Sequence, residues 1–274
     1  MKFLNPKKFL FLVIINFLGS SAYAGWLDLN MPQGVTDISQ EVYSLHMLIL
    51  YICCIIGVVV FGAMFWSILK HRKSKGVIPS TFHESTKLEF LWTIVPFVIL
   101  IGMAVPATKV LIKMYDHGDS EIHIKVTGYQ WLWQYEYLKT DVSFYSKLST
   151  PYNEIYNKKE KNENYLQEVD NELVVPINKK IRFLLTSNDV LHAWWVPDLA
   201  LKRDAIPGFI NEMSVTINEP GVYRGRCAEL CGRHHGFMPI VIRAIAEDEY
   251  KEWLANASKA KSSDLAVTKK IKGE

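Results

Sequence analysis

Residues 227–238 bring together the side chains of this chain that are best suited to bind a soft metal. The segment contains two thiols, two imidazoles and a thioether, supplied by Cys227, Cys231, His234, His235 and Met238. Thiolate and thioether sulfur together with imidazole favour copper over metals that prefer oxygen ligands. A single-copper electron-transfer site uses one Cys, two His and a weakly bound Met, so a second Cys is the extra ligand that two coppers would need to share bridging sulfurs. We therefore interpret this segment as a copper-binding loop.

Two cysteines at this spacing also have simpler explanations, which the sequence of the loop alone does not exclude. Two cysteines in an exported protein could form a disulfide. Two Cys and two His could also hold a structural zinc ion, although Met238 would then have no role. The C-x-x-C-H sequence of a covalently attached haem is absent. A second His ligand is expected from elsewhere, and His192, which follows a predicted apolar strand in the same domain, is the best candidate.

The N-terminus has the features of a secretory signal peptide. Lysines precede an apolar run over residues 9–18, and an Ala-Tyr-Ala sequence ending at Ala24 provides a cleavage site. The apolar run is too short to span a hydrocarbon core of about 30 Å. We predict a signal peptide over residues 1–24, with an uncleaved anchor as the alternative, followed by an exported segment over residues 25–41.

Two later segments are long and apolar enough to cross a membrane. Residues 42–69 contain no Asp, Glu, Lys or Arg, and the same holds for residues 90–108. At about 1.5 Å of rise per residue, both can span the hydrocarbon core as helices. We predict transmembrane helices over residues 42–69 and 89–110. The loop between them, residues 70–88, is rich in Lys and Arg, which places it in the cytoplasm and both chain ends outside.

The distribution of charge argues against nucleic-acid binding. The chain of 274 residues has 31 Lys+Arg and 28 Asp+Glu, a formal net charge of +3. The basic excess lies at the N-terminus and in the 70–88 loop, where it acts as a targeting and topology signal. No basic patch remains that would hold a polyanion.

The exported part of the chain has the pattern of a β-domain. Residues 121–126 alternate between polar and apolar side chains, and residues 130–137 are dense in aromatic ones. Further strands are predicted over residues 172–175, 180–186, 211–217, 221–227 and 238–244. Many short strands separated by turns predict a sandwich or small barrel over residues 111–246. Within it, the polar residues 146–170 are predicted to be a surface insertion. Residues 247–274 are predicted to form a helix and then a mobile tail.

The loop from Cys227 to Met238, together with Val190-Leu191-His192, resembles the binuclear copper A site of subunit II of the haem-copper cytochrome c oxidase family. The resemblance extends over nearly the whole chain after the signal peptide. It implies a membrane α-helical hairpin of two transmembrane helices and an all-β cupredoxin-like Greek-key domain.

The resemblance also implies a role for each residue of the loop. Cys227 and Cys231 would bridge two copper ions through their thiolates. The remaining ligands would be the ring nitrogens of His192 and His235, the sulfur of Met238 and the backbone carbonyl of Glu229. His234 would not be a ligand.

The resemblance also implies roles other than copper binding for four residues. Trp131 corresponds to the exposed aromatic residue through which cytochrome c delivers its electron, with a core tryptophan as the alternative. Glu89 corresponds to a carboxylate at the cytoplasmic entrance of a proton path in subunit I, although it could be an ordinary helix-boundary residue. The side chain of Glu229, and less securely that of Asp204, corresponds to the region near an Mg2+ ion at the interface with subunit I.

Carboxylates around the copper site would steer a basic cytochrome toward it. Glu136, Asp141 and Asp189 match family positions of this kind, whereas Lys139 and Asn188 fall where acids often occur.

The resemblance implies a subunit of a respiratory oxidase in a bacterial inner membrane, with the copper domain in the periplasm. It would accept electrons from cytochrome c and pass them to haem in subunit I, where O2 reduction is coupled to proton pumping. A quinol oxidase subunit II would lack the copper ligands. A membrane-anchored copper-delivery protein is the alternative from a different class, but it would have no need for Trp131 or Glu89.

Overall fold

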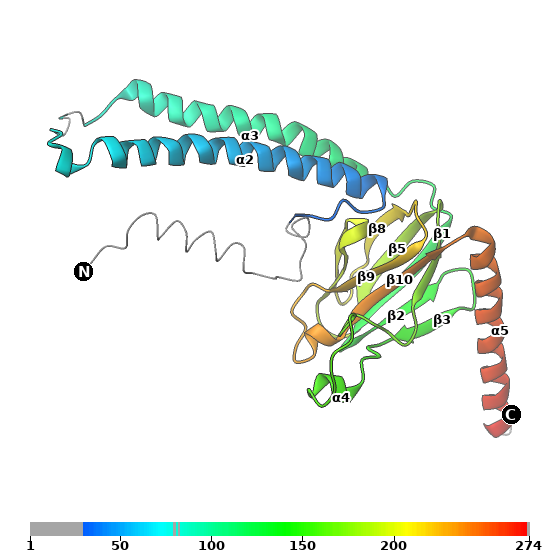
Figure 1. Cartoon of the computed structure of the whole chain (residues 1–274). Helices are drawn as coiled ribbons and strands as arrows, with labels where there is room; N and C mark the ends of the chain where they lie inside the picture. The colour runs from blue at the N-terminus through cyan, green and yellow to red at the C-terminus, as the bar shows by residue number, and fades with distance from the viewer. Residues whose placement is uncertain (1–29, 79–80, 82, 273–274) are drawn as a thin grey trace. The chain divides into compact units, whose positions relative to one another are not determined.

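The computed structural model describes residues 30–272 apart from 79, 80 and 82, so the predicted signal peptide lies outside the described residues. Two long helices come first, α2 over Asp37–Lys70 and α3 over Thr86–Met114. Thr36 and Ser39 form a capping box at the start of α2, which satisfies backbone N–H groups that would otherwise lack partners. The two helices lie side by side (Figure 1), and an ion pair between Glu41 and Lys113 joins the start of α2 to the end of α3.

Both helices expose their apolar side chains. In α2 Val58 is 75% exposed and Trp66 63%, and in α3 Phe90 is 67% exposed. Exposure of this much apolar surface is unfavourable in water but suits a helix surrounded by lipid tails. The helices begin and end outside the uncharged segments, and they enclose the basic turn η2 over Lys73–Lys75. The hairpin is therefore the membrane-spanning part of the chain.

The rest of the chain forms two five-stranded sheets. The first has the strand order β3-β2-β1-β5-β8 and the second β4-β10-β9-β6-β7. The first sheet consists of β1 Ile122–Tyr129, β2 Leu132–Tyr137, β3 Ser143–Ser146, β5 Lys180–Ser187 and β8 Asn211–Thr216. The second consists of β4 Leu173–Pro176, β6 His192–Val196, β7 Leu201–Ala205, β9 Gly221–Cys227 and β10 Pro239–Ile245.

The hydrophobic core lies between the inner faces of the two sheets. Alternate residues of β2 and β5 are buried, as expected for strands that pack on one face only. The Phe183 and Trp194 rings meet across the sheets with their centroids 5.1 Å apart, and the Trp194 indole N–H donates a hydrogen bond to the Tyr135 hydroxyl. This arrangement confirms the predicted cupredoxin-like β-domain, which follows the two-helix hairpin in the chain.

Three strands escape prediction from the sequence. β6 is short, buried on nearly every residue and ended by Pro197, so it shows no alternation. β7 has exposed charges at its centre, and β3 has only four residues. His192 therefore follows the predicted strand β5, as expected, and is itself the first residue of β6.

Two segments contain more helix than the sequence predicts. The 146–170 insertion contains the short helix α4 over Tyr152–Ile155, and its two ends pair through a bridge between Leu148 and Val169. Helix α5 runs over Glu247–Lys272, where the sequence predicts a mobile tail after residue 257. The polar tail is rich in Ala and Lys, which favour helix, and it has no Gly or Pro before Gly273.

Candidate metal centre

The two sheets bring His192 to the copper-binding loop. His192 begins β6, beside β9, whose last residue is Cys227. Its ring is fully buried and packs edge-on against Trp133, with the centroids 5.8 Å apart. Gly128 leaves room for the ring, because a Cβ atom there would lie 2.8 Å from His192 Cδ2. The ring is therefore held by packing before any metal is considered.

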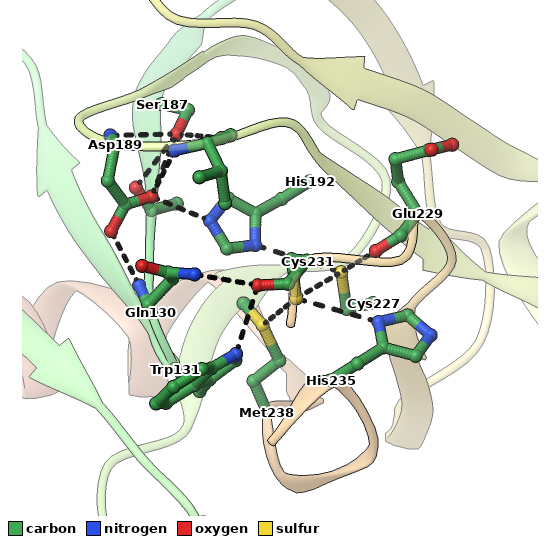
Figure 2. Close-up of polar contacts among 12 residues, drawn as sticks. Gln130, Trp131, Ser187, Asp189, His192, Cys227, Glu229, Cys231, His235 and Met238 are labelled. Carbon is green, nitrogen blue, oxygen red and sulfur yellow. Dashed lines mark hydrogen bonds and ion pairs between the residues drawn. The ribbon is translucent and has the colours of Figure 1, made fainter. Parts of the chain in front are cut away.

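The remaining candidate ligands converge on the two cysteine sulfurs (Figure 2). The Cys227 Sγ and Cys231 Sγ atoms are 3.9 Å apart, and Cys227 Sγ lies 3.9 Å from His192 Nδ1. Cys231 Sγ lies 3.5 Å from both His235 Nδ1 and Met238 Sδ. The backbone oxygen of Glu229 is 3.3 Å from Cys227 Sγ. All six predicted ligands thus present the expected kind of atom toward one region.

These separations fit shared metal ligation and do not fit a disulfide. Ligands bound tetrahedrally at about 2.0 to 2.3 Å are roughly 3.3 to 3.8 Å from one another. A disulfide would bring the two sulfurs to about 2.05 Å. Both cysteines are free and buried, and with His192 they form the metal-binding group found among the described residues.

The electrostatics of the two thiols also favour a bound cation. Burial acts to raise the pKa of Cys227, but hydrogen bonding from His192 and backbone groups lowers it below the usual value. Burial and the neighbouring Cys227 charge raise the pKa of Cys231. One thiolate therefore disfavours the other, and a cation between them would remove that repulsion.

Asp189 orients His192, a role that the sequence analysis did not assign to it. The Asp189 Oδ1 atom lies 2.9 Å from His192 Nε2, and Oδ2 accepts a hydrogen bond of 2.7 Å from the Gln130 backbone N–H. Burial acts to raise the pKa of Asp189, but these hydrogen bonds hold it below the usual value. A carboxylate on one ring nitrogen fixes the tautomer that leaves the other nitrogen free for a metal. Its position three residues before His192 is the signal that could have indicated this.

Replacing Asp189 with asparagine is expected to weaken copper binding by about tenfold or more. Asparagine has one acceptor oxygen, so its amide N–H2 would face either Gln130 N–H or His192 Nε2–H. Competition titration of the copper-free protein against a chelator would measure the change. Asp141→Asn is the matched control, because Asp141 is exposed. Equal copper affinity in the Asp189→Asn variant and the wild type would contradict this role.

Trp131 contacts the loop directly. Its indole N–H donates a hydrogen bond of 3.2 Å to the backbone oxygen of Cys231, and the Gln130 side chain donates another of 2.8 Å to the same oxygen. Gly232 follows with a φ of +116°, and a Cβ atom there would lie 3.2 Å from the Trp131 ring. Glycine is thus needed both for its backbone conformation and for the approach of Trp131. Trp131 is partly buried and is not a core residue.

Of the aromatic residues near Trp131, one packs in the core and another lies at the surface. Trp133 is fully buried and donates a hydrogen bond of 3.3 Å to the Met238 backbone oxygen, so it holds the copper-binding loop from the side of the core. The His234 ring meets Trp131 edge-on with the centroids 4.7 Å apart. His234 therefore belongs to the surface around Trp131 and contributes no ligand atom to the cluster of sulfurs.

The side chains with predicted roles other than copper binding lie in different surroundings. Glu89 lies in the first turn of α3, a position where a carboxylate also stabilises the helix end. The carboxylates of Glu229 and Asp204 are exposed, and neither belongs to a metal-binding group among the described residues. Glu136 pairs with Lys125 at 3.0 Å. Of the predicted docking acids, Glu136 and Asp189 thus have partners within the chain.

The geometry defines a membrane-anchored β-domain with a buried site of two Cys, two His and one Met. Comparison with known proteins then identifies the family. The family model described as cytochrome c oxidase subunit II, periplasmic domain, matches residues 122–245, and the corresponding transmembrane domain model matches residues 24–110. The chain belongs to the cytochrome c oxidase subunit II family, as the sequence analysis predicts, and is thus a subunit of a haem-copper oxidase. The copper-delivery and quinol oxidase alternatives are not supported.

Two relatives identified by sequence agree with this assignment, and one similar solved structure is given beside them. A probable cytochrome c oxidase subunit 2 of Rickettsia conorii is 37% identical over 82% of this chain and 70% of its own length. The cytochrome c oxidase subunit 2 of Metridium senile is 37% identical over 90% of this chain and 96% of its own length. The periplasmic domain of subunit II of cytochrome oxidase of Bradyrhizobium japonicum is a similar solved structure, with 39% identity, 52% and 97% coverage of the two chains, and a TM-score of 0.46.

Proposed function

We propose that this subunit receives electrons from cytochrome c at a binuclear copper centre and passes them to haem in subunit I. The observation that carries the proposal is the convergence of two free, buried cysteine sulfurs, two His nitrogens and a Met sulfur at 3.5 to 3.9 Å. Copper bound there would supply a one-electron redox centre, because soft sulfur and imidazole ligands suit both of its oxidation states. The surrounding residues determine how rigidly that centre is held and how electrons reach it.

The ligands are held rigidly by residues from both sheets. Asp189 and Gly128 fix the His192 ring, Trp133 bonds the Met238 backbone, and Gln130 bonds the Cys231 backbone. An electron-transfer site benefits from such rigidity, since little reorganisation is then needed when its charge changes. A ligand set that is complete within the chain also suits a relay, whereas a catalytic metal keeps an open position.

Trp131 is the proposed point at which electrons enter. Its partly exposed ring is one hydrogen bond from the Cys231 backbone, so it lies between the surface and the ligand loop. A donor that touches this ring would be coupled to the centre through a short chain of bonded atoms.

Other oxidase subunits, with subunit I first among them, are the expected partners of the exposed hairpin.

The basic loop between the helices supports an orientation with the copper domain outside the cytoplasm. Lys70 ends α2, and Arg72, Lys73 and Lys75 follow it directly. Short loops rich in Lys and Arg remain in the cytoplasm. With the predicted signal peptide, this favours the periplasmic face of a bacterial inner membrane.

Two further parts of the proposal concern neighbouring subunits. Glu89, at the start of α3, would lie on the cytoplasmic side and is proposed to stand at the entrance of a proton path. The exposed Glu229 carboxylate is available to an Mg2+ ion only together with oxygen ligands from a partner, since Mg2+ requires octahedral coordination.

Spectroscopy of the purified oxidase tests the proposal. The expected electron paramagnetic resonance spectrum shows one unpaired electron shared by two coppers, accompanied by a near-infrared absorption band. In a stopped-flow experiment with reduced cytochrome c, this band should lose intensity before the haem absorption changes. A spectrum of mononuclear copper, or reduction of haem before the near-infrared band, would contradict the proposed function.

A further inference from the structure

The Ser187 side chain lies beside the turn that leads from β5 to His192 (Figure 2). Ser187 is the last residue of β5, and it is buried although the residues between it and His192 are exposed. Its partner on the parallel strand β1 is Gly128, the residue that leaves room for the His192 ring. A buried hydroxyl needs hydrogen-bond partners, and the partners of Ser187 show what its hydroxyl can do.

The Ser187 hydroxyl binds two backbone groups of the turn. Its Oγ atom lies 2.5 Å from the Val190 carbonyl oxygen and 3.2 Å from the Asp189 backbone nitrogen. Two other oxygens are more distant, Gly128 O at 3.3 Å and Asp189 Oδ1 at 3.4 Å. A serine hydroxyl has one proton to donate, and the shortest contact assigns that proton to the Val190 carbonyl. The Ser187 oxygen then accepts a hydrogen bond from the Asp189 N–H.

Together with the Asp189 side chain, these contacts form a closed set of three hydrogen bonds. The Asp189 N–H donates to Ser187 Oγ, and the Ser187 hydroxyl donates to the Val190 carbonyl. The Val190 N–H in turn donates to Asp189 Oδ1 at 2.6 Å. Serine side chains often bond the backbone two residues further on, which stabilises a turn. Here the third hydrogen bond adds the Asp189 carboxylate to the turn that Ser187 stabilises.

The turn directs the Asp189 carboxylate at His192. The oxygen that accepts from Val190, Oδ1, is also the atom that lies 2.9 Å from His192 Nε2. The Asp189 side chain is 28% exposed, so it could rotate toward water if the turn relaxed. The Gln130 backbone N–H holds the other oxygen, Oδ2, at 2.7 Å. The Ser187 turn therefore fixes the carboxylate oxygen that faces the His192 ring.

The neighbouring hydroxyl of Thr186 has a different partner. Its Oγ1 atom donates to the Ile206 carbonyl at 3.3 Å. Successive side chains of a strand point to opposite faces, so Thr186 and Ser187 lie on different sides of β5. Among the described residues, no hydrogen bond joins the Thr186 hydroxyl to Asp189 or His192. Thr186 thus offers a hydroxyl with the same kind of acceptor but without a connection to the metal centre.

We propose that Ser187 is a positioning residue of the metal centre, whose hydroxyl holds the Asp189 carboxylate in place and, through it, the ring of His192. This inference rests on the proposed function, because its effect is measured on copper held by His192. A carboxylate bonded to one ring nitrogen makes the other nitrogen a stronger donor and fixes the orientation of the ring. The oxidised centre carries more positive charge and gains more from a stronger donor than the reduced centre does. Loss of the Ser187 hydroxyl should therefore raise the reduction potential.

Redox titration of the copper centre in the purified oxidase, followed through its near-infrared band, tests the inference. Ser187→Ala removes only the hydroxyl and should weaken the preference of the centre for its oxidised state about threefold. For a one-electron couple, this change raises the reduction potential by about 28 mV. Pulsed electron paramagnetic resonance should also show altered couplings of the His192 ring protons. Thr186→Ala removes a neighbouring hydroxyl that bonds a backbone oxygen, and it should leave both measurements at the wild-type values.

A double variant shows whether Ser187 acts through Asp189. Adding Ser187→Ala to Asp189→Asn should shift the potential no further than Asp189→Asn alone, because the carboxylate that Ser187 positions is already absent. A wild-type potential in Ser187→Ala, equal shifts in Ser187→Ala and Thr186→Ala, or additive shifts in the double variant would each overturn the positioning role. A wild-type oxidase that lacks the near-infrared band would instead overturn the proposed function.

Discussion

Replacing Cys231 with serine is expected to lower turnover with cytochrome c by more than about 100-fold and to remove the copper signal. Cys231 Sγ lies within 3.9 Å of Cys227 Sγ, His235 Nδ1 and Met238 Sδ, so its loss removes a ligand atom that lies next to three others. A serine hydroxyl is a hard, neutral donor at physiological pH and cannot replace a soft bridging thiolate. Copper content, near-infrared absorption and steady-state turnover of the purified oxidase would measure the loss.

Cys53→Ser provides a control with the same chemical change. Cys53 is a free, exposed cysteine of α2, within the membrane-spanning hairpin and outside the metal centre. It should leave copper content and turnover at the level of the wild type. A Cys231→Ser variant that retains both coppers would show that this sulfur is not a bridging ligand.

Replacing Trp131 with phenylalanine is expected to lower kcat/KM for cytochrome c by about tenfold, equivalent to about 1.4 kcal/mol. Phenylalanine retains an aromatic ring but loses the indole N–H that donates to the Cys231 backbone oxygen. It also shortens the ring that meets His234 at the surface. Turnover with a small reductant that does not need to dock should change little, because the copper ligands are untouched. The two rates, measured on the same preparation, give the comparison.

Trp195→Phe is the matched control for this prediction. Trp195 is a partly exposed tryptophan of β6 whose ring lies under the charged groups of Lys202 and Arg226, and it makes no contact with the Cys231 backbone. Its replacement should leave both rates close to the wild type. An equal loss with the small reductant and with cytochrome c in Trp131→Phe would assign Trp131 a structural role in the loop.

The carboxylates predicted to attract a basic cytochrome illustrate how side-chain pairing alters a prediction from the sequence. Each of the three predicted docking acids, Glu136, Asp141 and Asp189, is negatively charged. Judged from the sequence, each is available to attract a basic cytochrome. In the structure Lys125 pairs with Glu136, and Asp189 is committed to His192. The sequence does not reveal the pairing of Lys125 with Glu136, because it depends on the register of β1 and β2. The spacing of Asp189 and His192 is visible in the sequence, but the hydrogen bond from the Gln130 backbone that completes the arrangement is not.

The membrane hairpin and most of the candidate ligands could be predicted because their signals are local. A helix that spans lipid must be apolar along its whole length, and α2 and α3 follow the two uncharged segments closely. Cys227, Cys231, His235 and Met238 lie in one loop, so their spacing already defines a ligand set. His192 could be predicted as a ligand only from the resemblance and from its position after a predicted apolar strand.

The tertiary structure decided which distant groups complete the site. Gln130 bonds to Asp189 and to Cys231, which are 59 and 101 residues away along the chain, and only the packing of two sheets brings them together. The same packing places the 146–170 insertion beside Trp131, although its polar sequence indicates nothing more than a surface position. The sequence by itself determined which atoms could bind a metal and where the chain crosses the membrane, since both depend on residue type and short spacing. Orientation of the ligands and the shape and charge of the surface above them depend on contacts between segments far apart in the chain, and these exist only in the folded protein.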